Sequence, residues 1–179
     1  HRIEVAKSRP DAAPGKSAAP DTERSGLDTV AARIDHVVVA VQNLAETMAF
    51  FVDRLGFHRQ PLVGPDDTGI AVMSAGGVTV VLVSPDAGES VARYLDRHGT
   101  GVQHVAIEVL NAGFARAGLA ARDVPLLTEV VVDEHGMEQF FTVQDTSSGV
   151  QLGFVSRTGH RVGFSGANVR ALFDAIGER

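Results

Sequence analysis

The first cluster of hydrophobic positions along the chain is residues 34–41 (IDHVVVAV). This run is rich in β-branched side chains and predicts a buried strand. The next segment starts at Asn43, a residue suited to cap a helix, and it continues with apolar residues at helical spacing until Gly56. Two further apolar runs, 69–73 and 78–83, predict strands. The helical apolar positions are Leu44, Met48, Phe51, Val52 and Leu55. Together these elements form one module.

The second half of the chain repeats this plan. RIDHVVVAVQN and GVQHVAIEVLN share the pattern H-V-x-x-x-V-x-N, so His36 and Asn43 have the same spacing as His104 and Asn111. A helix over 112–123 is predicted next, followed by strands at 128–132, 138–143 and 150–155. A shared strand, cap and helix in one order indicate an internal duplication. We therefore predict an α+β domain of two β-α-β-β-β modules whose strands pair into a curved, barrel-like mixed sheet.

The predicted domain is single and covers residues 31–179, with module one at about 31–85 and module two at about 100–157. Residues 1–30 contain mostly Pro, Ala, Ser and charged residues, which predicts a flexible N-terminal tail. The alternative for this tail is an arm that becomes ordered on a partner subunit.

Charge and composition restrict the classes of partner that the chain is expected to bind. The net charge is -6, the pI is near 5.6 and no Lys/Arg run occurs, which argues against nucleic acid and against an anionic membrane surface. The chain has no cysteine, so a metal would need His, carboxylate, amide or water ligands. No apolar run is long enough to span a bilayer and the first residues lack a signal-peptide core, so we expect a cytoplasmic protein.

His36 and His104 occupy equivalent positions in the two modules. A pseudo-twofold axis relating the modules would bring both imidazoles together on one face of the sheet, where small neighbours leave room for a cation and a ligand. This arrangement indicates a divalent metal site, although a histidine on a strand is commonly a hydrogen-bonded core residue. The other histidines are expected at the surface: His58, His98, His135 and His160.

The chain resembles the vicinal-oxygen-chelate superfamily, and within it the C-terminal catalytic domain of 4-hydroxyphenylpyruvate dioxygenase. The similar segments are IDHVVVAV, FFVDRLGF, YLDRHGTGVQHVAIEV, DEHGMEQFFT and GFSGANVRALFDAIGER. The resemblance implies that His36 and His104 match two iron ligands and that Gln139 and Phe141 line the substrate pocket. It also implies that a C-terminal helix at about 167–178 closes the pocket, with Phe164 before it and Phe173 on it. An ordinary amphipathic helix packed on the core would give the same pattern.

Three positions depart from the family pattern. The resemblance places the third iron ligand, a glutamate, at Gly153 or Leu152, and neither residue can bind metal. The corresponding position of module one falls near Val81, and an aromatic residue of the family corresponds to Val169. Other oxygen donors are available nearby in the sequence: Gln151, which shares a strand face with Gly153, Glu108 and Glu138.

Three functions follow from these residues. The first is a dioxygenase-like non-haem metalloenzyme, an oxidoreductase that acts on a small keto-acid or oxygenated metabolite through Fe(II) or another divalent metal at His36 and His104. The alternative is a metal-free protein of the same fold that binds a small molecule such as an antibiotic or metabolite, without any cofactor. The third is an epimerase or isomerase, for which Glu108 or Glu138 would serve as base. Since members of this fold often pair, we expect a homodimer.

Overall fold

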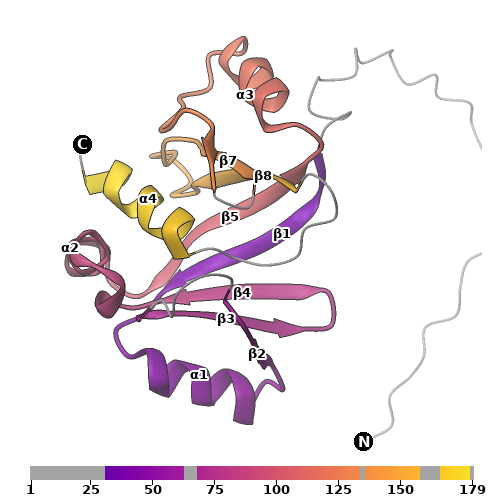
Figure 1. Cartoon of the computed structure of the whole chain (residues 1–179). Helices are drawn as coiled ribbons and strands as arrows, with labels where there is room; N and C mark the ends of the chain where they lie inside the picture. The colour runs from indigo at the N-terminus through magenta and orange to yellow at the C-terminus, as the bar shows by residue number, and fades with distance from the viewer. Residues whose placement is uncertain (1–30, 63–67, 134–135, 158–165, 178–179) are drawn as a thin grey trace, which may run out of the picture.

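The computed structural model describes residues 31–62, 68–133, 136–157 and 166–177. Eight strands form one mixed sheet in the order β2-β3-β4-β1-β5-β8-β7-β6, and helices lie on both of its sides (Figure 1). The sheet is open, since β2 and β6 form its two edges. The strands are β1 (Ala31–Ala40), β2 (His58–Gln60), β3 (Ile70–Ala75), β4 (Val78–Val83), β5 (Gly101–Val109), β6 (Val131–Val132), β7 (Met137–Phe141) and β8 (Leu152–Arg157).

The strand pairing confirms the predicted duplication. β1 pairs in parallel with β4 and β5 pairs in parallel with β8, so the first strand of each module lies beside the last strand of the same module. β1 and β5 then pair antiparallel with each other and join the two modules into one sheet. The pseudo-twofold axis therefore passes between β1 and β5, the two strands that carry His36 and His104.

Each module carries its own helix on the outer face of the sheet. α1 (Leu44–Asp53) packs on the first module through Leu44, Met48 and Phe51. α3 (Ala112–Ala120) packs on the second module. The side chains of Asn43 and Asn111 accept hydrogen bonds from the backbone nitrogens of Glu46 and Phe114, so the repeated asparagines are helix caps in both modules, as the sequence predicts.

Two other helices cover the first-module half of the inner face. α4 (Gly166–Gly177) lies in the range expected for the C-terminal helix and packs Val169 and Phe173 against β1, β3 and β4. α2 (Glu89–His98) follows the short 3-10 turn η1 (Pro85–Ala87) and adds Val91 and Leu95 to the same cluster. α2 was not predicted from the sequence. Its N-cap is Gly88, which offers no capping side chain, so the usual start signal of a helix is missing.

Two strands also differ from the sequence expectation. The strand predicted at 128–132 shortens to Val131–Val132, and the residues before it approach β7 through single contacts such as Leu126 with Thr142. β2 is a short edge strand of three exposed residues that hydrophobic patterning does not reveal. Short or exposed edge strands bury few side chains, and the alternation that predicts strands is therefore weak in them.

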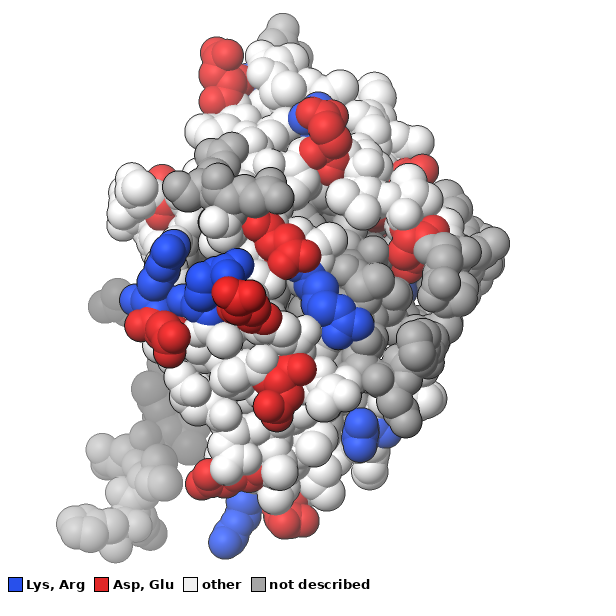
Figure 2. Space-filling view, turned by 60° about the vertical axis from the view of Figure 1, so that its left-hand side comes forward, with Lys and Arg blue, Asp and Glu red and all other residues white. Residues whose placement is uncertain are grey.

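The surface shows intermingled charge on the face drawn in Figure 2, where Lys and Arg side chains lie next to Asp and Glu. Within the described residues, no helix has the length and apolar character needed to cross a membrane. The predicted tail over residues 1–30 lies outside the described residues, as do Phe164, His135 and His160.

Candidate functional site

The two equivalent histidines meet on the inner face of the sheet. His36 pairs with Ala106 and His104 pairs with Val38, so both rings project from the central pair of strands toward the same side. Their ring centroids lie 5.6 Å apart with an interplanar angle of 78°. Only 6% of His36 and 3% of His104 is exposed. The duplication therefore does what the sequence suggested: it brings His36 and His104 together.

A β-bulge precedes each histidine. In the β1 and β5 ladder, the register passes from Ile34 to His36 with Asp35 as the extra residue, and on the opposite strand Gln103 is the extra residue before His104. A bulge interrupts the strict alternation of side chains and re-aims the extra residue. In both modules the side chain of that residue turns to the histidine beside it. The local geometry around the two imidazoles is therefore duplicated along with the strands.

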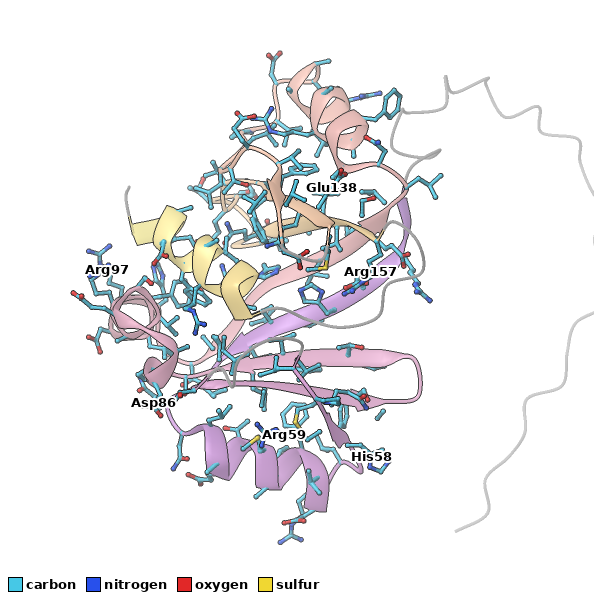
Figure 3. All side chains as sticks on the ribbon, in the orientation of Figure 1. His58, Arg59, Asp86, Arg97, Glu138 and Arg157 are labelled. Atoms are coloured by element: carbon cyan, nitrogen blue, oxygen red, sulfur yellow. The ribbon has the colours of Figure 1, made fainter. Side chains whose placement is uncertain are left out.

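The first bulge residue links His36 to the end of β8. The Asp35 carboxylate lies 2.7 Å from Nδ1 of His36. Arg157 donates to the same carboxylate from Nε at 2.7 Å and from Nη2 at 2.8 Å. Arg157 comes from the second module and is the last residue of β8, which is separated from β1 by β5 (Figure 3). Bidentate arginine pairs of this kind are strong and directional, so Asp35 is held in one orientation.

The second bulge residue starts a chain of neutral hydrogen bonds. Oε1 of Gln103 lies 2.5 Å from Nδ1 of His104, and Nε2 of Gln103 donates to Oε1 of Gln151 at 2.5 Å. Nε2 of Gln151 in turn donates to the backbone carbonyl of Thr142 at 2.9 Å. Gln151, expected as an oxygen donor to a ligand or metal, thus has its amide oxygen and one amide hydrogen engaged inside the protein.

Burial keeps both histidines neutral near pH 7. Burial lowers the pKa of His36, and the neighbouring Asp35 opposes this shift only in part. The pKa of His104 is lowered further, by burial first and by the proximity of His36 second. For Asp35, burial alone would raise the pKa, but the hydrogen bonds and charges of Arg157 and His36 hold it well below its ordinary range. The site therefore contains neutral imidazoles and an ionised carboxylate.

Nε2 of His104 is buried and has no hydrogen-bond partner in the described structure. A buried nitrogen in this state costs free energy, because water can no longer solvate it. Such an atom fits an electrophilic partner, either a metal ion or a hydrogen-bond donor of a ligand. Among the residues that the structure describes, it is the most direct sign of a binding site.

Gly153, where the resemblance places the third iron ligand, lies between Ala106 on β5 and Phe141 on β7. A Cβ atom at this position would lie 3.0 Å from Cε1 of Phe141 and 3.1 Å from Cδ2 of His104. The Phe141 ring also contacts His104 edge to face, with centroids 5.2 Å apart. The phenyl ring therefore occupies the space that a side chain at position 153 would need.

The other expected site residues are spread over the inner face. Gln139 and Phe141 alternate on β7, are buried, and face the same side as Gly153. Phe173 is buried on α4, but it packs in the first-module cluster against Tyr94, with ring centroids 5.2 Å apart. Phe164 lies outside the described residues. Gln139, Phe141 and the two histidines thus belong to the second-module half and the central strands, whereas Phe173 belongs to the first-module half.

The two glutamates expected as possible carboxylate donors lie away from the histidines. Glu108 accepts a hydrogen bond from Nε of Arg33 at 2.6 Å near the far end of β5. Glu138 alternates with Gln139 and Met137, and so projects to the opposite face of β7 (Figure 3). His58 is exposed on the edge strand β2, and His98 is exposed at the end of α2, stacked on Tyr94.

The donor set fits a divalent metal in part. Imidazole nitrogens bind such ions at about 2.1 Å, so two rings that share an ion have centroids within about 6.5 Å of each other, and the observed 5.6 Å satisfies this. In metal-binding histidines the second ring nitrogen is also hydrogen-bonded to a carboxylate, carbonyl or amide, as it is in both histidines here. Among the described residues, however, no group of three or more His, Cys, Asp or Glu side chains is placed to hold an ion. The residues therefore suit an ion that takes its remaining ligands from a bound molecule.

Sequence reasoning missed Asp35, Gln103 and Arg157. A polar residue directly precedes the histidine in both modules (IDH and VQH), and that shared position was the available signal. Strict alternation along a strand would put this residue on the face opposite the histidine. A bulge changes that, but the hydrophobic pattern of the sequence does not reveal a bulge. Arg157 is distant in sequence from Asp35, and only the sheet order brings them together.

Residues 35–141 match the family model of the glyoxalase/bleomycin resistance protein/dioxygenase superfamily. The chain belongs to this superfamily. The matched residues include both histidines and β7, whereas β8 with Gly153 and Arg157 follows them. The vicinal-oxygen-chelate fold expected from the sequence is thereby confirmed, together with the superfamily.

Individual superfamily members differ in activity. The chain is 30% identical over 150 residues to a 4-hydroxyphenylpyruvate dioxygenase of Coccidioides posadasii, covering 73% of this chain and 37% of that protein. It is 29% identical over 123 residues to the mitochondrial methylmalonyl-CoA epimerase of Bos taurus, covering 66% of this chain and 70% of the epimerase. A methylmalonyl-CoA epimerase in complex with methylmalonyl-CoA and NH4+ shares the fold with a TM-score of 0.61 at 23% identity, over 72% of this chain and 96% of that one. The chain thus spans about a third of the dioxygenase.

Proposed function

We propose that the chain binds a divalent metal, with Fe(II) as the first choice, between His36 and His104, and that a small keto acid or another oxygenated metabolite supplies the oxygen ligands that the protein lacks. The observation that carries this proposal is the buried, unpartnered Nε2 of His104 beside a second imidazole at 5.6 Å. A bound ion would act as a Lewis acid on an oxygen of the ligand and, if it is iron, as a redox centre.

The protein's own residues would bind and orient this ligand. His36 and His104 are already neutral, so neither has to lose a proton before it binds a metal. Phe141 and Gln139 line the inner face beside them, which supports an aromatic and an amide contact to the ligand. A dioxygenase-like reaction is the favoured chemistry because one curated relative is a 4-hydroxyphenylpyruvate dioxygenase.

The first test is metal content with and without a chelating keto acid. The untagged protein is loaded anaerobically with Fe(II), with and without phenylpyruvate, and bound iron is measured after desalting. We expect close to one equivalent of iron with the keto acid, clearly less without it, and loss of iron in His36→Ala and His104→Ala. His98→Ala removes an exposed histidine and should retain the iron. Absence of bound iron under both conditions would overturn the proposal.

A metal-free binding protein is the second candidate function. Its supporting observation is the Phe141 ring, which fills the space beside Gly153 and leaves no third protein ligand there. In this case Nε2 of His104 would accept a hydrogen bond from the ligand. Ligand binding that is unchanged by a metal chelator, and lost in His104→Ala, would favour this function over the metalloenzyme.

Epimerase chemistry is the third candidate, and several relatives carry the name methylmalonyl-CoA epimerase. It would need a carboxylate base near the ligand. Glu108 is paired with Arg33, and Glu138 faces away from Gln139, so neither is placed for this role without rearrangement. Exchange of a ligand C–H hydrogen with deuterated solvent would detect this activity directly.

The homodimer and the cytoplasmic location stay predictions. Light scattering of the purified chain would give its mass in solution, and a mass of twice the chain's 18.9 kDa would support the dimer.

A further inference from the structure

We propose that Asp35 and Gln103 are positioning residues that fix both histidines in the tautomer with hydrogen on Nδ1. Arg157, the last residue of β8, anchors Asp35, and Gln151, the residue just before β8, anchors Gln103. The tautomers follow from hydrogen-bond chemistry alone. Their consequence for metal binding deepens the proposed function and rests on it.

For His104 the direction of the hydrogen bonds is set by a backbone group. The Thr142 carbonyl can only accept, so the group of Gln151 that faces it is the amide NH2. The amide oxygen of Gln151 then faces Gln103 and receives its NH2, which leaves Oε1 of Gln103 toward His104. An oxygen acceptor requires hydrogen on Nδ1, and Nε2 is left with its lone pair. Rotating the side-chain amide of Gln103 or Gln151 by 180° would place two acceptors, or two donors, against each other.

For His36 the direction of the hydrogen bond to Asp35 is set by charge. The guanidinium of Arg157 carries only donors, and it stabilises Asp35 as a carboxylate, which carries only acceptors. The Nδ1 of His36, 2.7 Å from this carboxylate, must therefore carry hydrogen. The two modules thus reach the same tautomer by different routes, one anionic and one neutral.

Because one histidine is backed by a carboxylate and the other by an amide, we expect the two to differ in strength as metal ligands. A carboxylate behind an imidazole raises its strength as a ligand more than a neutral amide does. We expect His36 to be the stronger ligand and Asp35 to matter more than Gln103 for metal affinity. Removal of an outer partner of this kind typically lowers affinity by about 10-fold to 100-fold. Asp35→Asn should lie toward the upper end of that range and Gln103→Leu toward the lower end.

Packing around the rings does not by itself select one tautomer, whereas the hydrogen bonds of Asp35 and Gln103 do, so the tautomers are the decisive readout. Long-range ¹H–¹⁵N NMR spectra of the metal-free, ¹⁵N-histidine-labelled full chain at neutral pH distinguish a protonated from an unprotonated ring nitrogen. Resonances of His36 and His104 are assigned from His36→Gln and His104→Gln. We expect both rings to carry hydrogen on Nδ1 in the unmodified protein. Hydrogen on Nε2 in either ring would overturn the inference, without need of any variant.

Variants then test the two routes separately. Gln151→Met should release Gln103 and give a mixture of tautomers at His104 only, and Arg157→Met should disturb His36 only. Glu108→Gln changes a carboxylate on the same strand pair that does not touch either ring, and should leave both unchanged. If Gln151→Met leaves His104 unchanged, or Arg157→Met leaves His36 unchanged, although the variant is folded, the route assigned to that histidine is contradicted. Because these spectra need no metal, correct tautomers in a protein that binds no iron would uphold the positioning role while the proposed function fails.

Discussion

The guanidinium of Arg157 donates two hydrogen bonds to the carboxylate of Asp35, so the last residue of β8 holds the bulge in the middle of β1. The pair crosses from one module to the other and is nearly excluded from solvent, with side-chain exposures of 12% and 6%. A buried ion pair gives little net stability when it is compared with apolar residues, but loss of one partner leaves a buried charge alone.

Arg157→Met should therefore destabilise the protein substantially. We expect the free energy of unfolding to fall by about 3–5 kcal/mol, because Asp35 would stay buried without its main partner. Urea unfolding followed by circular dichroism measures the change. Arg33→Met is the matched control, since Arg33 also pairs with a carboxylate across the modules but is exposed, and its removal should change stability little. Equal effects of the two substitutions would contradict the buried role of Arg157.

Stability should fall as the pH drops below the ordinary histidine pKa of 6.5. Both buried histidines have lowered pKa values, so the unfolded chain binds protons at a pH where the folded protein does not. The free energy of unfolding then decreases as the pH falls from 6.5 toward the folded-state values, by up to about 1.4 kcal/mol per pH unit for each histidine. Urea unfolding at a series of pH values gives the slope.

The variant His104→Gln provides the check on this pH dependence. It removes one of the two buried groups, and the slope below pH 6.5 should shrink by up to about half. His98→Gln, which changes an exposed histidine, should leave the slope as it is. A slope unaffected by His104→Gln would mean that other groups cause the acid sensitivity.

Gly153→Glu should fail to create a third metal ligand by itself. The new side chain would have to displace the Phe141 ring, and overpacking of this kind lowers the free energy of unfolding by about 1–3 kcal/mol, given a Cβ distance of 3.0 Å. In Gly153→Glu combined with Phe141→Ala the carboxylate gains room beside His104. We expect this double variant to hold iron without a keto acid, measured as bound iron after desalting. Phe141→Ala alone is the control and should not.

Phe173→Ala should loosen α4 from the inner face. Phe173 is fully buried against Tyr94 and the first-module cluster, and truncation of such a phenyl ring costs about 3–5 kcal/mol. Hydrogen exchange should accelerate in α4 and α2 more than in α3, which packs elsewhere. Ser90→Ala removes only the hydrogen bond from Ser90 to Asp174 and should cost about 1 kcal/mol. Uniform exchange across all helices would contradict a local effect.

Local signals in the sequence determined much of this protein. The H-V-x-x-x-V-x-N pattern carries a strand, a cap and a helix in each module, and all of these depend on neighbouring residues. Because the two copies are equivalent, their duplication also predicted that His36 and His104 would meet. α2 escaped prediction because Gly88 gives it no capping side chain, and β2 because its residues bury no apolar surface.

The tertiary structure decided what surrounds the histidines. The register between β1 and β5 creates the bulges at Asp35 and Gln103, and the order of the strands brings Arg157 and Gln151 to them. It also sets the Phe141 ring against Gly153. Spacing along one strand predicts which residues share a face, but bulges and pairing between distant strands depend on the free energy of the whole sheet. The sequence therefore determined which two imidazoles meet, and only the folded sheet decided how each is held.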